Sequence, residues 1–313
     1  MQIRPLLPHE IEASCSLFRT VFGQMRSPAE WHWKFAEAPV LAATNLVGVG
    51  SNGQLVAHVG AQMFEGRWGD QPLRWVHACD VMVHPQARGD LGPDNLYRSL
   101  MRALDDELQH LGPASWPMFI YGFPGIRPAR LGERMGLYRR LYTCAAQQGG
   151  DPPRGLLARW RATQGWRAQA VPWSTLHDPG LAAFWRRAAA PSVAGIGQLK
   201  TAAYLDWRYA RHPTQRYRLW LLRRTWVSPR GWLVTTEAGS PEVIDASLPV
   251  DLPLRQALAA LAAASRTGGW RCWLPGDFST VATPIVAVEF SGVGRFHPDW
   301  PLPRFQPGDT DVF

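Results

Sequence analysis

Apolar residues recur along the N-terminal half with two periods, and these predict an ordered series of helices and strands. Helical spacing predicts helices over residues 9–22, from the Ser27 cap to Pro39, and over residues 95–110 and 128–135. Short apolar runs bounded by turn residues predict strands over residues 3–7, 45–50, 55–64, 73–84, 118–123 and 137–145. This order is typical of an α/β fold in which helices flank a mixed sheet.

Capping residues support two of these helices. Ser27 is followed by Pro28 and then by Glu30, the pattern of a capping box. Asp94 or Asn95 is suited to cap the helix that ends at His110, and the leucines of that helix form one stripe at positions 96, 100, 104, 108 and 111. We expect this stripe to be buried against the sheet.

The sequence repeats itself with an offset of about half the chain. Residues 30–39 resemble residues 205–213, because both carry a tryptophan, a basic residue, an aromatic residue and, four positions later, a proline. A similar order follows the second copy: a Thr201-capped helix, strands over residues 217–222, 231–237 and 243–248, a helix over 254–265, and strands over 270–274 and 286–290. We therefore predict two domains of one fold, residues 1–148 and 154–313, separated by a break rich in glycine and proline at residues 147–153.

Composition sets limits on the class of protein. The chain has 313 residues, of which 46% are hydrophobic and 19% charged, as in ordinary globular domains. No apolar run is long enough to span a membrane, and the first residues have no signal-peptide pattern, so we expect a cytoplasmic protein. The four cysteines are far apart with no CxxC pair, which indicates neither a disulfide framework nor a metal site.

The net charge of +8 comes almost entirely from arginine, since only two of the 33 basic residues, Lys34 and Lys200, are lysines. Arginines cluster between positions 208 and 224, but they fall inside an alternating apolar pattern rather than along one polar helix face. We interpret them as solvated residues beside strands, or as a basic rim near a phosphate-bearing ligand. A nucleic-acid partner is the least supported interpretation.

One loop has the geometry of an anion site. The strand predicted over residues 73–84 runs into a glycine-containing loop, residues 84–92, that opens the next helix. This arrangement points main-chain N–H groups and the positive end of a helix at one spot, which suits a diphosphate. The corresponding segment of the second half, residues 249–253, has two prolines, an aspartate and no glycine, so we expect no such site there.

The segment Val83-His84-Pro85-Gln86-Ala87-Arg88-Gly89 is similar to the "V-x-P-x-x-R-G-x-G" strand exit of the GNAT superfamily of acyl-CoA N-acyltransferases. Residues 132–137 resemble the "Y-E-K-L-G-F" segment of that family, and residues 121–124 its fifth strand. The resemblance covers nearly the whole chain, as a tandem of two GNAT-like domains of which the second is degenerate. Mycothiol synthase is similar in plan.

The resemblance implies acetyl-CoA or another acyl-CoA as co-substrate and an amine as acceptor, and we expect transfer of an acetyl group to a small molecule. It places the thioester oxygen near the main chain of Val81, Met82 and Val83, where an N–H group can stabilise a developing negative charge. The diphosphate would lie on the loop residues Arg88, Gly89, Asp90, Leu91 and Gly92.

Candidate catalytic residues follow from the chemistry of the transfer. An alkylammonium must lose a proton before it attacks, so a carboxylate or histidine near the strand exit is useful. Asp80 is the first candidate, because it is a charged residue in an apolar strand, and His77 stays an alternative because the family's bulge in this strand can re-aim either face. Tyr121 and Tyr138 are candidate acids for the departing thiolate.

Two departures from the family pattern leave an alternative open. The loop carries Pro93, which has no amide donor, and Asp90, which adds negative charge. The position that matches the family's thiolate-protonating tyrosine is Gly132. These departures support the alternative of a catalytically inactive GNAT-fold protein with a binding or structural role. The sequence does not indicate the acceptor's identity or the oligomeric state.

Overall fold

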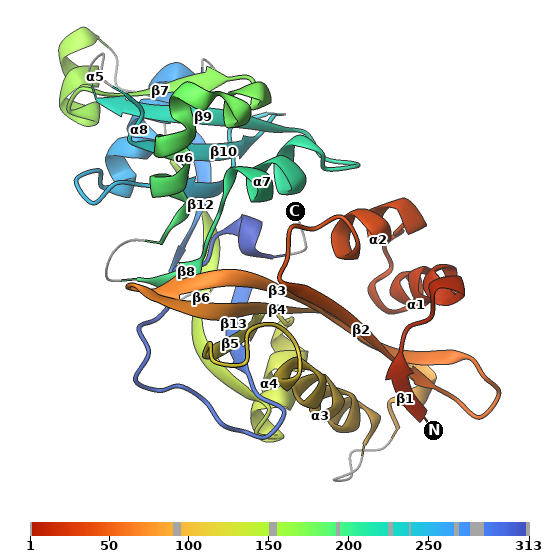
Figure 1. Ribbon diagram of the computed structural model, residues 1–313. Helices are drawn as coiled ribbons and strands as arrows, with labels where there is room; N and C mark the ends of the chain where they lie inside the picture. Colours follow the sequence, from red (N-terminus) through yellow and green to blue (C-terminus); the bar gives the residue numbers. More distant parts are fainter. Residues whose placement is uncertain are drawn as a thin grey trace. The chain divides into compact units, whose positions relative to one another are not determined.

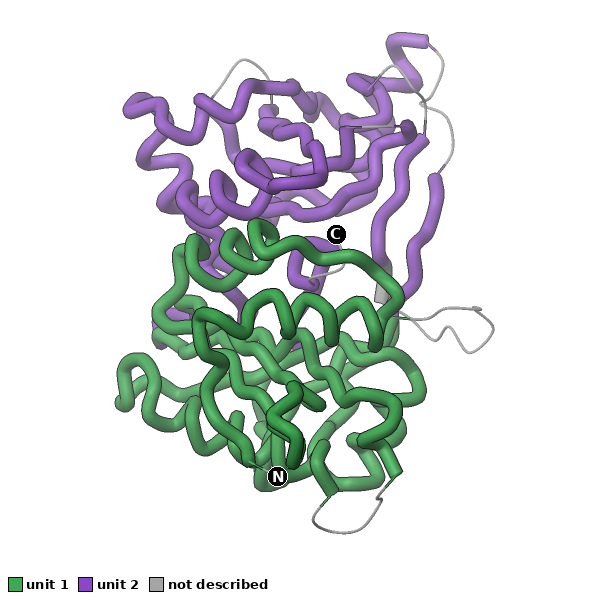
Figure 2. Tube along the Cα trace, turned by 90° about the vertical axis from the view of Figure 1, so that its right-hand side faces the viewer, with its two compact units in different colours: residues 1–66, 72–143, 284–300 green, residues 67–71, 144–283, 301–313 purple. Residues whose placement is uncertain are grey.

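The computed structural model describes residues 2–89, 95–149, 155–191, 195–224, 228–237, 239–265, 269–275 and 285–310. The chain forms two compact units (Figure 2). Unit 1 comprises residues 1–66, 72–143 and 284–300, and unit 2 comprises residues 67–71, 144–283 and 301–313. Each unit combines helices with a β-sheet, which confirms the predicted α/β class.

Unit 1 contains one mixed sheet. Its strands are β1 (Gln2–Pro5), β2 (Ala42–Val49), β3 (Leu55–Trp68), β4 (Gln71–Val83), β5 (Met118–Gly122), β13 (Ile285–Phe290) and the first part of β6 (Tyr138–Gly149). They lie in the order β1-β2-β3-β4-β5-β13-β6. The first three pair in antiparallel fashion, β4 and β5 are parallel, and β5 and β13 are antiparallel.

Helices cover both faces of this sheet (Figure 1). They are α1 (Ile11–Phe22) and α2 (Pro28–Phe35) on one face, and α3 (Leu96–Gln109) and α4 (Ile126–Arg134) on the other. The predicted leucine stripe of α3 is buried: Leu100 and Leu104 are fully enclosed and pack with sheet residues such as Val59 and Val76. On the opposite face, Leu17 and Phe18 of α1 pack against Met82.

Local signals in the sequence are confirmed. The Ser27 hydroxyl accepts a hydrogen bond from the Glu30 amide at 3.2 Å, and the Glu30 carboxylate accepts one from the Ser27 amide at 2.8 Å. The Asn95 side chain accepts from the Arg98 amide at 2.9 Å and begins α3. Thr201 caps the helix of the second copy in the same way, accepting from the Tyr204 amide at 3.2 Å.

Unit 2 is built around an antiparallel sheet in the order β11-β10-β9-β7. Its strands are β7 (Trp166–Val171), β8 (Ile196–Gln198), β9 (Tyr217–Arg224), β10 (Gly231–Thr236), β11 (Val243–Ser247) and β12 (Trp270–Pro275), and its helices are α5 (Leu156–Thr163), α6 (Ala182–Ala189), α7 (Ala202–Leu205) and α8 (Leu254–Ala264). A parallel bridge between Glu242 and Arg271 connects the strand β11 region to β12. In both units, therefore, a helix connects two parallel segments, α3 between β4 and β5 and α8 between β11 and β12.

The compact units do not coincide with the predicted continuous domains, residues 1–148 and 154–313. Strand β13 follows β12 in the chain, yet it pairs with β5 inside unit 1, with Val288 opposite Gly122. The second part of β6, residues 144–149, pairs with β12 inside unit 2. Each unit thus receives one strand from the opposite half of the chain. The hydrophobic pattern of a segment indicates a strand, but it does not indicate the neighbouring strand in the sheet. The sequence therefore predicted two continuous domains.

Four elements in residues 155–200 were not predicted: α5, β7, α6 and β8. Helix α5 has no buried apolar stripe, since its leucines and tryptophan are exposed. Strand β7 lies at the end of its sheet and carries the mixed sequence Trp-Arg-Ala-Gln-Ala-Val. Neither segment has the apolar periodicity from which an element is recognised.

Candidate active site

Strands β4 and β5 pair over only part of their length. The parallel ladder runs from Arg74 opposite Met118 to His77 opposite Tyr121. Both strands lie within the described residues, and β4 continues to Val83 beyond the last pair. The main chain of Val81, Met82 and Val83, predicted to face the thioester, therefore lies in the part of β4 that extends past the ladder. A polar ligand group that reaches this part of β4 can form hydrogen bonds with the main chain at the end of the strand rather than with a side chain.

Asp80 bends β4 directly after the ladder ends. Its φ of +50° lies in the left-handed region, which a non-glycine residue rarely adopts. Such a conformation costs about 1–3 kcal/mol and persists only where neighbouring contacts hold it. The predicted alternation of the strand is interrupted here, so side-chain directions on either side of Asp80 do not follow one continuous pleat.

Two cations from α2 and the α1–α2 connection hold the Asp80 carboxylate. Lys34 Nζ donates to Asp80 Oδ1 at 3.0 Å, and the Arg26 guanidinium donates to Oδ2. The Asp80 and Lys34 side chains are 2% and 6% exposed, so this is a buried ion pair rather than a surface one. Sequence reasoning singled out Asp80 but missed both partners. The rarity of lysine in the chain is the one signal that pointed to Lys34.

The same cluster continues into the sheet through His58. Its Nδ1 lies 2.9 Å from the Asp80 carbonyl oxygen, and its Nε2 lies 3.1 Å from Asn45 Oδ1. The ring is fully buried, and burial lowers its pKa. Gln62 Nε2 donates to the Lys34 carbonyl oxygen at 2.6 Å. These bonds fasten α2 to strands β2, β3 and β4, and they hold the bend at Asp80 in place.

Tyr121 and His77 meet where the two strands part. Their rings stack with centroids 5.1 Å apart and an interplanar angle of 13°, and Phe123 packs edge-on against both. Both side chains are buried. The structure thus brings Tyr121 together with His77, the alternative base, at the last pair of the ladder.

Tyr138 lies elsewhere, between β6 and the helices α3 and α4. Its hydroxyl is 2.5 Å from the Tyr97 hydroxyl, and burial raises its pKa to about 12. The Tyr138 ring occupies the space over Gly132: a Cβ built on that glycine would come within 2.1 Å of the ring. The glycine that replaces the family's tyrosine is therefore a consequence of packing, because a larger residue at position 132 and Tyr138 cannot share this space.

The loop after β4 is described as far as Gly89. Arg88 Nε donates to the Val83 carbonyl oxygen at 2.8 Å, which folds the loop back onto the strand end. A Cβ built on Gly89 would meet no atom of the described residues within 4 Å, so those residues leave the main chain there open. The remaining predicted contacts of the diphosphate, Asp90, Leu91 and Gly92, lie outside the described residues.

Unit 2 contains a second buried lysine–aspartate cluster. Lys200 Nζ lies 2.6 Å from Asp245 Oδ1 and 2.7 Å from Asp309 Oδ1, and the Tyr209 hydroxyl donates to Asp245 Oδ2 at 2.7 Å. Asp245 is on β11, the strand that precedes the crossover helix α8, just as Asp80 is on the strand that precedes α3. Each lysine of the chain is thus paired with an aspartate, and the two aspartates lie at corresponding places in the two units, although Lys34 is on α2 and Lys200 precedes α7.

The described helices include none long and apolar enough to cross a membrane. Among the described residues, no group of three or more His, Cys, Asp and Glu side chains is placed to hold a metal ion. All four cysteines are buried, and none of them is in a disulfide.

Comparison with known proteins finds a family match for the N-terminal part and a fold likeness for nearly the whole chain. Residues 2–119 match the family model described as "Acetyltransferase (GNAT) domain". A search of curated proteins finds no match. The fold is similar to that of a GCN5-related N-acetyltransferase from Anabaena variabilis, with a TM-score of 0.64 at 12% identity over 92% of this chain and 72% of that one.

Two further solved structures are similar over nearly the whole chain. A probable N-acyltransferase from Enterococcus faecalis has a TM-score of 0.62 at 13% identity, over 92% of this chain and 71% of that one. A GCN5-related N-acetyltransferase from Sphaerobacter thermophilus has a TM-score of 0.54 at 16% identity, over 92% of this chain and 94% of that one. At these identities the likeness concerns the fold, and the family match concerns the N-terminal part. Residues 2–119 therefore match a GNAT acetyltransferase domain, and the fold is similar to that of solved GNAT proteins.

Proposed function

We propose that the protein transfers an acetyl group from acetyl-CoA to the amine of a small molecule. The observation that carries this proposal is that the β4–β5 ladder ends at His77 and Tyr121, while β4 continues unpaired with β5 to Val83 and then enters the loop that begins at His84. A strand that outruns its neighbour offers main-chain donors to a thioester, and the following loop leads to the N-terminus of a helix. The match of residues 2–119 to an acetyltransferase domain supports the same reaction class.

The described residues fit acetyl-CoA as a substrate. Val81, Met82 and Val83 would bond to the acyl end through their main chain, and Arg88 and Gly89 would bind toward the diphosphate. The exposed Arg88 guanidinium supplies positive charge, and the open surroundings of Gly89 let a phosphate approach the main chain. We propose the same role for the loop residues Asp90, Leu91 and Gly92.

The reaction itself needs two proton transfers. The amine nitrogen attacks the thioester carbon, the C–N bond forms and the C–S bond breaks. One proton leaves the nitrogen, and one proton joins the departing sulfur. The residues proposed for these transfers are Asp80 or His77 as acceptor, and Tyr121 or Tyr138 as donor.

The two candidate acceptors differ in their surroundings. Both Asp80 oxygens already bind cations, so an amine would have to replace Lys34 or Arg26 before it could give its proton to Asp80. His77 stacks on Tyr121 at the point where the strands part. Of the donors, Tyr138 holds its proton firmly because burial raises its pKa to about 12, and its hydroxyl is bonded to Tyr97.

Calorimetry and turnover test the proposal together. Titration of the full chain with acetyl-CoA and with CoA should show saturable binding, and a panel of small amines should release free thiol from acetyl-CoA. If millimolar acetyl-CoA gives neither binding heat nor thermal stabilisation, the proposal fails. The alternative is then a catalytically inactive protein of this fold with a binding or structural role.

Variants at positions 80 and 77 identify the proton acceptor. If Asp80 accepts the proton, Asp80→Asn lowers kcat by about 100-fold or more, removes the acidic limb of the pH–rate profile and leaves CoA affinity nearly unchanged. If His77→Asn removes that limb while Asp80→Asn retains it, His77 is the acceptor and Asp80 holds the strand. The denaturant midpoints of both variants show how much each substitution lowers the stability of the fold.

A further inference from the structure

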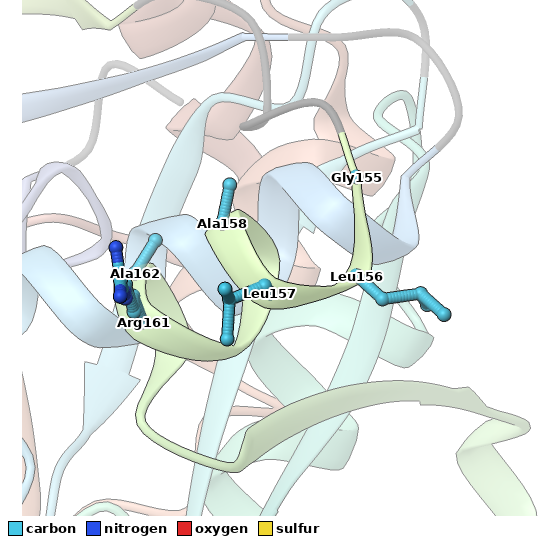
Figure 3. Close-up of a pocket in the computed structure, with 6 residues that line it drawn as sticks. All are labelled: Gly155, Leu156, Leu157, Ala158, Arg161 and Ala162. Carbon is cyan, nitrogen blue, oxygen red and sulfur yellow. The ribbon is translucent and has the colours of Figure 1, made fainter.

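Helix α5 exposes its large apolar side chains to solvent. Leu156, Leu157 and Trp160 are 88%, 63% and 62% exposed, although the helix packs against α8 within unit 2. Figure 3 shows the stretch from Gly155 to Ala162, with the Leu156 side chain extending away from the helix. Three such side chains on two helical turns are a contiguous apolar surface rather than scattered exposed residues.

The positions of these residues around the helix form a pattern. At about 100° per residue, Leu156, Trp160 and Leu157 fall within an arc of about 100°. Arg159 and Arg161 fall on the two sides of this arc, and both are exposed. An apolar stripe bordered by arginines on both sides is typical of a helix that lies in a membrane interface.

The charges carried by α5 and β7 themselves are of one sign, although Asp251 pairs with Arg224 and Arg230 near the start of β7. From residue 155 to residue 177 the sequence contains Arg159, Arg161 and Arg167 and neither aspartate nor glutamate. Arg167 of β7 lies opposite Arg223 of β9 in the antiparallel ladder, which places two cations side by side on this sheet. The surface that surrounds the apolar stripe therefore attracts anions.

We propose that α5 binds reversibly to a lipid surface that carries anionic headgroups. Leu156, Leu157 and Trp160 enter the boundary between headgroups and acyl chains, and the arginines bind the phosphates above them. A nucleic acid would bind the arginines but leave the two leucines in water, so lipid accounts for more of the surface. The described residues contain no spanning helix, and two helical turns suit a shallow, reversible attachment.

Co-sedimentation with vesicles tests this proposal on the full chain. The protein should bind vesicles of phosphatidylcholine with 30% phosphatidylserine, bind pure phosphatidylcholine much less, and dissociate as salt is raised. The double substitution Leu156→Ser and Trp160→Ser should weaken binding about tenfold or more, since two of the three apolar anchors are lost. Reversal of charge at Arg159 and Arg161 to glutamate should weaken it as well.

Matched variants in the same unit serve as controls. Val250→Ser removes an apolar side chain that is 87% exposed on a loop, and Arg186→Glu with Arg187→Glu reverses two exposed charges on α6; both should bind vesicles like the natural sequence. Equal binding by the α5 variant and the natural sequence would overturn the proposal. So would self-association in sedimentation velocity without vesicles that the α5 variant abolishes, because the helix would then join two copies of the chain.

Discussion

Gly132 and Tyr138 occupy one space in unit 1, and each determines what the other can be. The tyrosine ring lies where a side chain at position 132 would begin. Its hydroxyl bonds to Tyr97 at the start of α3, so the pair of tyrosines ties β6 to that helix. In the sequence, Gly132 is recognised only as the position where the family pattern has a tyrosine. The reason for the glycine depends on a contact six residues away, which no motif encodes.

Gly132→Ala should destabilise the protein by about 1–3 kcal/mol, because the added methyl group forces the Tyr138 ring out of position. Gly89→Ala is the control, since a Cβ there meets nothing within 4 Å. Urea denaturation measures both changes. Combining Gly132→Ala with Tyr138→Leu should recover part of the loss; an unchanged midpoint for Gly132→Ala alone would contradict the packing argument.

His212 links stability to pH. Burial, followed by the charges of Arg208 and Arg216, lowers its pKa to about 4, and its Nδ1 accepts from the amides of Thr214 and Gln215. The unfolded chain takes up this proton near pH 6.5. Between pH 6.5 and 4 the unfolded state therefore binds more protons than the folded state, and stability falls as the pH falls.

His212→Asn should flatten this dependence. The natural sequence should lose up to about 1.4 kcal/mol of unfolding free energy per pH unit through His212 in this window, whereas the asparagine keeps an acceptor and does not titrate. Urea denaturation at pH 7, 6 and 5 gives both slopes. His58, whose pKa burial also lowers, is present in both proteins and cancels in the comparison. Parallel slopes would exclude His212 as the source.

At the scale of elements, the two units use one device to fix a helix onto a strand. In unit 1 the segment that contains Trp33 and Lys34 is bonded to Asp80 of β4, and in unit 2 the matching segment with Trp207 and Tyr209 is bonded to Asp245 of β11. Unit 2 has this buried carboxylate although its loop lacks glycine. The fold therefore uses an aspartate at this place independently of any cofactor loop.

The cluster of unit 2 also holds the last described segment of the chain. Asp309 lies beside Lys200, Gln306 Nε2 donates to the Ala246 carbonyl oxygen at 3.0 Å, and a Cβ on Gly308 would come within 2.0 Å of the Tyr209 hydroxyl. Residues 301–310 thus lie against α7 and β11 as an ordered tail with one 3-10 turn, Pro307–Asp309. Removing the lysine would leave two buried carboxylates without their cation.

Lys200→Met should therefore cost about 3–5 kcal/mol of stability, the usual effect of leaving a buried charge uncompensated. Arg230→Ala, which breaks the exposed pair with Asp251, should cost about 1 kcal/mol or less. Chemical denaturation compares the two. Adding Asp245→Asn and Asp309→Asn to Lys200→Met should restore part of the stability, and a Lys200→Met variant as stable as Arg230→Ala would refute the anchoring role.

For the elements themselves, periodicity and capping residues were sufficient. The helices after Ser27, Asn95 and Thr201 begin where the caps predict, and the strands of the βαβ crossovers lie within a few residues of the predicted bounds. The candidate site was predicted in part. Asp80 and the β4 exit are visible in the sequence, but the partners Arg26 and Lys34 come from a different helix pair, and their approach depends on tertiary packing.

At the scale of the whole molecule, the exchange of strands decides which parts of the chain fold together. Unit 1 needs β13, residues 285–290, between β5 and β6. Glu289 of this strand is buried and bonded to Arg139 and His297, so the strand also completes a polar cluster. The sequence pattern predicted the strand β13 but assigned it to the second domain. The local sequence does not indicate that a strand pairs with another one far away in the chain.

A fragment of residues 1–148 should therefore fail to fold cooperatively, because β5 and β6 lose the strand between them and expose open edges. Residues 1–143 joined to residues 284–300 by a flexible linker should regain a cooperative transition. Circular dichroism melts and size-exclusion chromatography distinguish the two fragments. A monomeric, cooperatively melting 1–148 fragment would restore the continuous domain boundary that the sequence suggested.

The position of β13 also governs the order of events on the ribosome. Synthesis delivers the first strands of unit 1 early, but their sheet stays incomplete until residues near 290 have left the exit tunnel. Domains usually fold as they emerge, the N-terminal one first. Here the half that is made first must wait for the half that is made last, and during that interval β5 and β6 lack the strand that lies between them.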